Sequence, residues 1–250
     1  MQNVVDSWPN RADVPPLEED TIHVWRIWLA EPDGRIRSFR DLLTDAEQQQ
    51  ADRFLFDEHR QRFTAGRAQL RRILGNYIDV APEQVDFKYT NLGKPYFAEG
   101  VSDPHLEFNF TNSKDWALLA ITYRTELGID IERIREMTNM EGLARRFFAQ
   151  PEIDVIVREP CEVRRQEHFF RCWTRKEAFL KAIGTGLTFP LGNVCVSIVD
   201  SEPVQIQWIK DRAEEASRWD LVHVMPIEGY VGAMARQSSG EQLLSWHWAV

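Results

Sequence analysis

The chain has 250 residues, 43% of them hydrophobic and 28% charged, a balance typical of a soluble globular protein with one large or two small domains. Its net charge of −9 argues against a nucleic-acid partner, which would need a clustered basic face. The apolar runs are too short to cross a membrane, and the polar, acidic N-terminus does not resemble a signal peptide. The cysteines lack CxxC spacing and the histidines are scattered. We therefore expect a cytoplasmic protein with reduced thiols and no histidine-based zinc site.

The N-terminal part of the chain alternates between extended and helical patterns. Residues 1–20 are proline-rich and acidic and are expected to form an extended arm, whereas residues 21–30 alternate as in a strand. Thr44 and Glu47 have the spacing of a capping box, which predicts the start of a helix. A longer helix is expected over about residues 57–77. Its basic side chains are Arg60, Arg62, Arg67, Arg71 and Arg72.

The rest of the chain repeats this mixture of strands and helices. A helical region is expected over about residues 143–157, and an aromatic-rich helix follows it and ends at Gly184, a residue suited to a helix C-cap. Further strands, joined by Gly, Pro and Asn turns, are predicted at residues 85–89, 106–110, 116–123, 128–134, 193–199, 204–210, 219–225, 230–235 and 243–250. Each half thus predicts a long helix against an antiparallel sheet, which is the α+β fold class occurring twice.

We divide the chain into three parts on this basis. The parts are the arm at residues 1–20, an N-terminal half at residues 21–126 and a C-terminal half at residues 127–250. The two long helical stretches, FTAGRAQLRRILG and WTRKEAFLKAIG, are faintly alike, which is consistent with two similar halves.

Three carboxylates and a lysine form the candidate reactive cluster. Asp130 and Glu132 are two residues apart on a predicted strand and should point to the same face, about 7 Å apart at Cα. Glu177 and Lys181 are four residues apart on a predicted helix and should lie one above the other. Carboxylate oxygens are the ligands that Mg²⁺ prefers beside a substrate phosphate, and a lysine stabilises phosphate charge. The cluster therefore predicts a magnesium site that grips a phosphate ester.

Each half of this cluster also has an ordinary structural interpretation. Two acidic residues on a strand are usually a solvated edge, and a Glu–Lys pair at this helical spacing is usually a surface ion pair worth a few tenths of a kcal/mol. The helix that carries Glu177 and Lys181 is rich in Phe and Trp rather than plainly polar. This context favours the functional interpretation.

Short motifs in a fixed order carry a resemblance to a known family. The motifs are GKP (93–95), FNFTNS (108–113), GIDIE (128–132), RRFF (145–148) and FFRCWTRKEAFLKAIGTGL (169–187). Together with the basic segment at residues 53–74, they resemble the Sfp-type (surfactin-synthetase-type) 4′-phosphopantetheinyl transferases. The resemblance covers about residues 20–235, and GIDIE and WxxKEAxxKAxGxG are its most specific parts.

The resemblance implies two similar α/β halves related by a pseudo-twofold, with the active site at their interface. It implies an enzyme that moves the phosphopantetheine arm of coenzyme A onto a serine of an apo acyl or peptidyl carrier protein and releases adenosine 3′,5′-bisphosphate. Asp130, Glu132 and Glu177 would hold Mg²⁺, or Mn²⁺ in its place. Glu177 would also be the general base, and Lys181 would stabilise charge on the pyrophosphate.

The resemblance places the coenzyme A nucleotide mainly in the N-terminal half. The loop at residues 93–95 would pack on the adenine, Arg62 would belong to the 3′-phosphate site, and residues 111–113 would touch the nucleotide phosphates. The expected coenzyme A contacts are Arg53, Arg62, Gly93, Lys94, Pro95, Thr111, Asn112, Ser113 and Lys181. A plain turn at residues 93–95 and a solvated arginine face are the alternatives for these segments taken alone.

Two departures from the family pattern remove positive charge from this donor site. Asn112 stands where the family has a histidine, and an asparagine cannot become cationic. Residues 46–50 (AEQQQ) offer no basic side chain where the family often has one. Unless Arg53, Arg62 or Arg67 compensates, affinity for coenzyme A should be lower.

Docking of the carrier protein should rely on a local basic surface, because carrier proteins are usually acidic and this chain is acidic as well. We expect Arg145 and Arg146 to contribute the charge, together with Arg164 and Arg165. Phe147 and Phe148 would form an apolar patch between them, although both are equally compatible with the core.

The preferred hypothesis is a magnesium-dependent phosphopantetheinyl transferase that acts as a monomer in the cytoplasm, with no nucleic-acid or membrane partner. The first alternative is a coenzyme A or carrier-protein binding module of the same fold that is catalytically weakened. Glu177 and Lys181 argue against it, since a pure binder has no need of a base. The second alternative, an unrelated α+β protein with a surface metal site, leaves the ordered motifs unexplained.

Overall fold

The computed structural model describes residues 4–91, 93–98, 105–212, 214–237 and 240–249. Its contacts divide the chain into two compact units. The N-terminal unit comprises Ser7–Arg124 and Glu241–Val250, and the C-terminal unit comprises Met1–Asp6 and Thr125–Gly240. Residues 1–3 of the predicted arm, Leu92 just before the predicted coenzyme A loop and Val250 of the predicted last strand lie outside the described residues.

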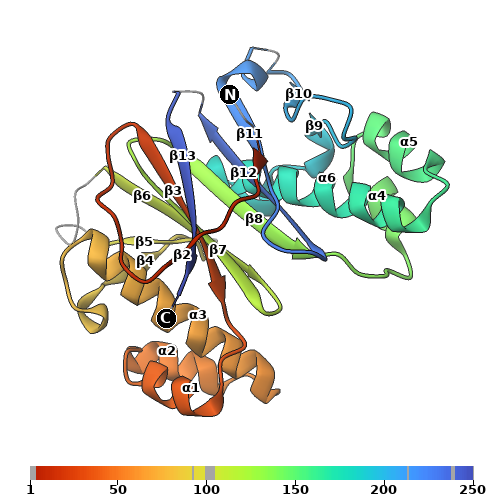
Figure 1. Ribbon diagram of the computed structural model, residues 1–250. Coiled ribbons are helices and arrows are strands. Elements are labelled where there is room, and N and C mark those ends of the chain that lie inside the picture. Colours follow the sequence, from red (N-terminus) through yellow and green to blue (C-terminus); the bar gives the residue numbers. More distant parts are fainter. Residues whose placement is uncertain (1–3, 92, 99–104, 213, 238–239, 250) are drawn as a thin grey trace. The chain divides into compact units, whose positions relative to one another are not determined.

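A five-stranded sheet forms the centre of the N-terminal unit, in the order β2-β13-β3-β7-β6. The strands are β2 (Asn10–Arg11), β3 (Thr21–Trp28), β6 (Leu106–Ser113), β7 (Trp116–Tyr123) and β13 (Gln242–Trp248). Strands β3, β7 and β6 are antiparallel neighbours, whereas β13 runs parallel to both β2 and β3. A two-stranded hairpin of β4 (Phe87–Tyr89) and β5 (Pro95–Phe97) lies beside β6 (Figure 1).

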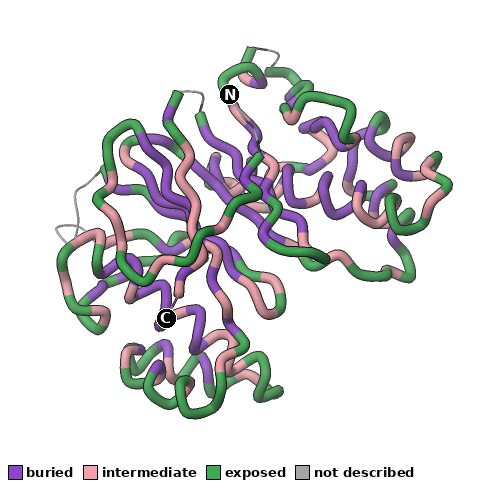
Figure 2. Tube along the Cα trace, in the orientation of Figure 1, coloured by how far each residue is buried: buried purple, intermediate pink, exposed green. Residues whose placement is uncertain are grey.

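Helices cover one face of this sheet. They are α1 (Asp33–Arg40), α2 (Asp45–Asp52) and α3 (Asp57–Tyr77), with the short 3₁₀ turn η1 (Pro82–Gln84) after α3. The capping box at Thr44 and Glu47 forms as predicted and begins α2. The buried side of α3, which includes Leu70 and Ile73, shares a core with Trp25 and Leu119 of the sheet. Figure 2 shows buried positions along both the helices and the strands of this unit. Burial of this apolar face, rather than helix propensity, stabilises α3.

The C-terminal unit has a four-stranded sheet in the order β1-β11-β12-β8. Its strands are β1 (Val4–Val5), β8 (Leu127–Arg133), β11 (Trp219–Val224) and β12 (Tyr230–Gln237), and β9 (Val194–Val196) pairs with β10 (Ile206–Ile209) separately. The helices are α4 (Met140–Phe147), α5 (Gln150–Arg158) and α6 (Glu162–Ala182), with 3₁₀ turns η2 (Gly186–Thr188), η3 (Leu191–Asn193) and η4 (Ala216–Arg218). The long helix α6 packs along β8 and β12.

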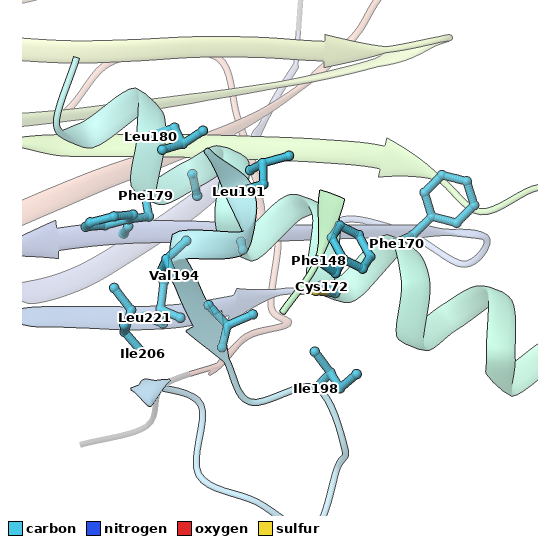
Figure 3. Close-up of a cluster of buried hydrophobic side chains, with 14 of the residues drawn as sticks. Phe148, Phe170, Cys172, Phe179, Leu180, Leu191, Val194, Ile198, Ile206 and Leu221 are labelled. Atoms are coloured by element: carbon cyan, nitrogen blue, oxygen red, sulfur yellow. The ribbon is translucent and has the colours of Figure 1, made fainter. Parts of the chain in front are cut away.

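An apolar core fixes α6 in this unit. Figure 3 shows Phe179 and Leu180 of α6 among side chains from the β9 and β11 strands, including Val194 and Leu221. Burying aliphatic and aromatic side chains of this size stabilises the folded state by about 1.5–3 kcal/mol each. The core thereby holds the helix that carries Glu177 and Lys181.

The α+β fold class is confirmed, since each unit sets a long helix against a sheet. The predicted antiparallel pairing is only partly correct, because β13 pairs in parallel with β2 and β3 and makes the sheet of the N-terminal unit mixed. The helix predicted over residues 57–77 and the strand predicted over residues 116–123 have the predicted bounds. The helical region predicted over residues 143–157 is two helices, because Phe148 and Ala149 adopt extended backbone and Pro151 lies in the first turn of the next helix. Helix α1, at residues 33–40, was not predicted.

The ends of the chain differ from the predicted division. The sequence assigned residues 127–250 to the C-terminal half, whereas β13 pairs along β3 in the N-terminal unit. The reason is aromatic packing, since the rings of Trp246 and Trp248 lie 5.1 and 5.5 Å from that of Trp25. The predicted arm contributes a short strand to each unit, β1 to one and β2 to the other. None of the helices within the described ranges is both long and apolar enough to cross a membrane.

Candidate active site

The sequence-predicted carboxylates and lysine come from two elements that pack directly together. Asp130 and Glu132 lie on β8, and Glu177 and Lys181 lie on α6. Gly128 permits this packing, because a Cβ at that position would overlap the backbone of Ala178 and Ala182. The glycine of the GIDIE motif therefore allows α6 to approach β8 closely enough to set the two pairs of side chains opposite one another.

Lys181 makes the shortest contact in this cluster. Its Nζ lies 2.6 Å from Oδ1 of Asp130 and also donates to the carbonyl oxygen of Ile129 at 3.2 Å. Asp130 is buried, while Glu132 is half-buried and lies 3.6 Å from Arg135. The cluster thus joins a buried carboxylate to a cation that remains in partial contact with solvent.

Glu177 is the carboxyl group whose protonation the cluster perturbs. Burial raises the pKa of Glu177 above its usual range, and the charges of Asp130 and Glu132 raise it further, while Lys181 partly offsets them. Its Oε1 is buried and has no hydrogen-bond donor among the described residues. A buried carboxylate oxygen without a donor is costly, and both a bound cation and a proton taken from a substrate would relieve that cost.

The argument for a metal ion rests on the type of ligand atoms present, because the side chains are not already arranged around a metal position. Within the described residues, no three or more His, Cys, Asp or Glu side chains are gathered closely enough to hold a metal ion. The ammonium group of Lys181 instead contacts the carboxylate of Asp130. The donor set still suits Mg²⁺, because three carboxylates on adjoining elements supply oxygen ligands and Glu177 leaves an oxygen without a donor among the described residues.

A cavity of about 670 Å³ lies in the N-terminal unit. Its walls come from the start of α2, from α3, and from β4 with the loop that follows it. The lining residues are Thr44, Ala46, Glu47, Gln50, Phe63, Arg67, Arg71, Asp86, Phe87, Tyr89 and Gly93. This volume is in the range of pockets that bind small molecules and cofactors.

The expected coenzyme A contacts are scattered relative to this cavity. Gly93 lines it, with a backbone φ of +81° that favours glycine. Arg62 instead pairs with Asp115 at 2.7 Å and with Glu58 at 3.0 Å. The other expected contacts from this unit are not among the lining residues: Arg53, Lys94, Pro95, Thr111, Asn112 and Ser113.

Sequence reasoning gave Arg67 only a compensating role and did not single out the aromatic side chains of the cavity, Phe63 and Tyr89. The guanidinium of Arg67 lies 5.5 Å from the centre of each of these rings. The i, i+4 spacing of Phe63, Arg67 and Arg71 on one helix face was the available signal. The pairing of that face with β4 depends on tertiary contacts, so the sequence did not reveal the cavity.

The expected carrier-docking residues divide between surface and core. Arg145 and Arg146 are exposed, the first bonded to Glu141 at 2.7 Å and the second stacked over the ring of Phe147. Phe148 is buried, so its assignment to a docking patch is corrected: its ring packs against Phe169 in the core. Figure 3 shows Phe148 among the buried side chains of the C-terminal unit. Phe147 is half-buried.

Comparison with known proteins gives the family. A profile of the 4′-phosphopantetheinyl transferase superfamily matches residues 126–235, and a profile of the N-terminal part of 4′-phosphopantetheinyl transferases matches residues 28–124. The chain is 38% identical over 232 residues to the 4′-phosphopantetheinyl transferase HetI of Nostoc sp., covering 93% of this chain and 94% of that protein.

Two further relatives have the same activity in their names. The chain is 30% identical to the 4′-phosphopantetheinyl transferase psf-1 of Bacillus pumilus, over 64% of this chain and 65% of that protein. It is 27% identical to the rat L-aminoadipate-semialdehyde dehydrogenase-phosphopantetheinyl transferase, over 66% of this chain and 55% of that protein. The chain belongs to the 4′-phosphopantetheinyl transferase family, as its motifs predict, and is an enzyme of the class that transfers phosphopantetheine from coenzyme A to carrier proteins.

Proposed function

We propose that this transferase requires Mg²⁺ and that Asp130, Glu132, Glu177 and Lys181 form its reactive centre. Glu177 carries the proposal: it lies on α6 facing two carboxylates of β8, has a raised pKa and keeps a buried oxygen without a donor among the described residues. A carboxyl group in that environment is suited both to bind a cation and to accept a proton at neutral pH.

The ion, when bound by the three carboxylates, would neutralise their mutual repulsion and polarise a phosphoryl oxygen of the coenzyme A pyrophosphate. Glu177 would accept the proton of the carrier serine hydroxyl, directly or through a water. The serine oxygen would then bond to the phosphorus that carries pantetheine, while the bond from that phosphorus to the bridging oxygen breaks. Adenosine 3′,5′-bisphosphate would leave with that oxygen.

Lys181 would stabilise the charge that develops on the leaving phosphate. Its Nζ is anchored by Asp130 and by the carbonyl of Ile129, so the ammonium is oriented before substrate arrives. Preorganised charge of this kind is usually the largest contribution to transition-state stabilisation in phosphoryl transfer.

The proposal assigns the nucleotide of coenzyme A to the N-terminal unit, where Arg53, Arg62, Gly93, Lys94, Pro95, Thr111, Asn112 and Ser113 are the proposed contacts. The cavity that includes Gly93 supports this assignment. For the acyl or peptidyl carrier protein, the exposed Arg145 and Arg146 with the half-buried Phe147 remain the proposed docking surface. The enzyme is further proposed to act as a cytoplasmic monomer.

The test is intact-mass spectrometry of an apo carrier protein incubated with the enzyme, coenzyme A and Mg²⁺. We expect a phosphopantetheine mass increment that disappears with a chelator and in Glu177→Gln. The matched control is Glu162→Gln, which changes an exposed glutamate at the start of the same helix and should transfer normally. Transfer at the wild-type rate in Glu177→Gln, or in the presence of chelator, would overturn the proposed mechanism.

A further inference from the structure

The part of α6 that precedes Glu177 buries two arginines one turn apart, Arg171 and Arg175. Arg171 donates to the carbonyl oxygen of Ile198 at 2.8 Å, and Arg175 donates to the carbonyl oxygen of Ser197. Ser197 and Ile198 follow β9 directly along the chain. Both guanidiniums therefore lie against the segment after β9, inside the C-terminal unit.

Two histidines adjoin these arginines. His168 is buried on α6 and lies one turn before Arg171. His223 lies on β11, on the strand face that it shares with Leu221 of the core around α6. Burial lowers the pKa of His223 to about 4, and the charges of Arg175 and Arg171 contribute. Burial, with the charge of Arg171, also lowers the pKa of His168. Both imidazoles are therefore neutral at pH 7, and a neutral imidazole can still donate one hydrogen bond.

Each of these four side chains keeps a buried nitrogen that has no hydrogen-bond partner among the described residues. The atoms are Nε of Arg171, Nε of Arg175, Nδ1 of His168 and Nδ1 of His223. A buried polar nitrogen without a partner is costly, and folded proteins leave few of them unpaired. A ligand whose atoms accept hydrogen bonds would relieve this cost at several of the nitrogens together.

One exposed carboxylate compensates the two buried guanidiniums. Asp200 pairs with Arg171 at 2.7 Å, although the side chain of Asp200 is 84% exposed. Arg175 bonds to the carbonyl and hydroxyl oxygens of Ser197, and within the described part of the chain no carboxylate lies at ion-pair distance from it. The further carboxylates with an electrostatic effect on the group are Glu159, Glu167 and Glu202. The buried group thus carries more positive charge than its direct partners neutralise.

We propose that His168, Arg171, Arg175 and His223 form a binding site for a phosphate-type oxyanion, for which the carboxylate of Asp200 competes. An exposed ion pair is weak, so the side chain of Asp200 can turn to solvent when another anion arrives. A phosphate group carries a charge of about −1.5 to −2 at pH 7, which matches two guanidiniums. Its oxygens accept readily from arginine nitrogens. Inorganic phosphate and the phosphoryl group of a larger molecule share this chemistry.

The oxyanion site is separate from the reactive centre, although both use α6. Arg175 and Glu177 are two residues apart on the helix and so do not face each other. Lys181 contacts Asp130 of β8, whereas Arg171 contacts the segment after β9. A bound phosphate would join α6 to β11 and to that segment, and so stabilise the C-terminal unit in proportion to its concentration. The inference therefore does not depend on the proposed function.

Calorimetric titration with inorganic phosphate, without Mg²⁺ and coenzyme A, tests the site in wild type, Arg171→Gln and Asp200→Asn. Arg171→Gln should weaken binding at least about tenfold, because a charge-assisted hydrogen bond is lost. Asp200→Asn removes the competing carboxylate and should tighten binding by about two- to fivefold, the scale of an exposed ion pair. A second titration, with glycerol 3-phosphate, distinguishes the sources. Binding of both probes would identify a phosphoryl group, and binding of inorganic phosphate alone would identify the free ion.

Asp154→Asn is the matched control, because it releases Arg158, an exposed arginine on α5 of the same unit. It should leave the affinity for phosphate unchanged. Asp200 is exposed, so Asp200→Asn keeps the fold and decides the question even if Arg171→Gln does not fold. An affinity in Asp200→Asn no higher than in wild type, or no binding to either, would overturn the inference. Binding that is lost in Lys181→Ala but kept in Arg171→Gln would assign the phosphate to the reactive centre and would overturn it as well.

Discussion

Two lysines of helix α6 each pair with a carboxylate from another element, and the two pairs differ in how far they are sealed from solvent. Lys176 lies 2.7 Å from Glu152, and Lys181 lies 2.6 Å from Asp130. The first pair is sealed, with side chains 0% and 1% exposed, whereas the side chain of Lys181 is 27% exposed. The distances are nearly equal, so the difference lies in access to solvent and to a substrate.

The sealed pair is completed entirely by the protein. Lys176 also donates to the carbonyl oxygens of Leu191 and Val194, and Glu152 accepts from the backbone N–H groups of Ala149 and Val196. These bonds fasten α6 to α5 and to the segment that begins β9. A buried charge with all of its partners supplied internally can position a helix but cannot take part in a reaction.

Lys176→Ala should have the largest effect on the free energy of unfolding, because it removes the cation of the sealed pair. This change leaves Glu152 without its cation and two carbonyl oxygens without their donor, so we expect a loss of about 3–5 kcal/mol in the free energy of unfolding. Urea unfolding followed by circular dichroism measures it. The double variant Glu152→Gln/Lys176→Met should be less damaging than Lys176→Ala. Equal stability of Lys176→Ala and wild type would show that the pair does not fasten the helix.

Lys181→Ala should reduce activity strongly and stability only slightly, the reverse of Lys176→Ala. We expect kcat/KM for coenzyme A to fall by about 10²- to 10³-fold, the usual cost of removing one group that stabilises developing charge, with the unfolding free energy changed far less than in Lys176→Ala. Steady-state transfer to an apo carrier protein measures the first quantity and urea unfolding the second. Lys181→Arg retains the charge and should recover part of the rate. A purely stability-based loss would contradict the role given to Lys181.

The N-terminal unit also has a buried hydrogen-bond network, formed by His23, Tyr77 and Trp25. Unlike the sealed Lys176–Glu152 pair, it should make stability depend on pH in the range where histidine titrates. His23 is fully buried, with Nδ1 2.7 Å from the hydroxyl of Tyr77, which also accepts from Trp25. Burial, with the nearby charge of Arg11, lowers the pKa of His23 to about 4. Between pH 6.5 and 4 the unfolded chain therefore binds more protons than the folded chain, and stability falls as the pH falls.

The contribution of His23 is fully present above about pH 6.5 and should be lost by about pH 4, at most about 3 kcal/mol. His23→Gln keeps a side-chain acceptor and should reduce the difference in unfolding free energy between pH 7 and pH 4.5. The exposed His59 provides the control His59→Gln. If the unfolding free energy of His23→Gln depends on pH as in wild type, protonation of His23 does not contribute to the loss of stability at low pH.

The smallest effect is expected at Asn112, which is exposed near the end of β6. Asn112→His restores a donor that can be cationic, so KM for coenzyme A should fall by a few-fold, most clearly below pH 6.5. Initial rates at pH 6 and pH 8 measure the change. If KM for coenzyme A stays the same at both values, another residue already supplies the missing charge.

The structure brings together the residues of the predicted reactive cluster, whereas the predicted donor-site contacts are scattered, for a physical reason. Asp130 with Glu132 and Glu177 with Lys181 are each set by the period of a single strand or helix, and the glycine at position 128 lets the two elements meet. Local periodicity was therefore enough to predict which of these side chains share a face within each element. The cavity around Arg67 is lined by residues of α2, α3 and β4. A local sequence pattern does not predict which distant segments will contact one another.

The same distinction accounts for Phe148 and for β13. The motif RRFF does not indicate which of its two phenylalanines is buried. In the structure α4 ends before Phe148, whose backbone is extended and whose side chain is buried. The last strand has an ordinary alternating pattern that fits either sheet. Its pairing with β3 follows from the tryptophan rings it shares with Trp25.

The central claim is that Asp130, Glu132 and Glu177 together hold a divalent cation, and titration with Mn²⁺ followed by electron paramagnetic resonance tests it most directly. In the presence of coenzyme A, wild type and Glu162→Gln should bind Mn²⁺ with similar affinity, and Mg²⁺ should displace it. Asp130→Asn and Glu177→Gln should each weaken binding at least about tenfold, the scale on which changes around a metal site act. Equally tight Mn²⁺ binding by the double variant Asp130→Asn/Glu177→Gln would contradict the account.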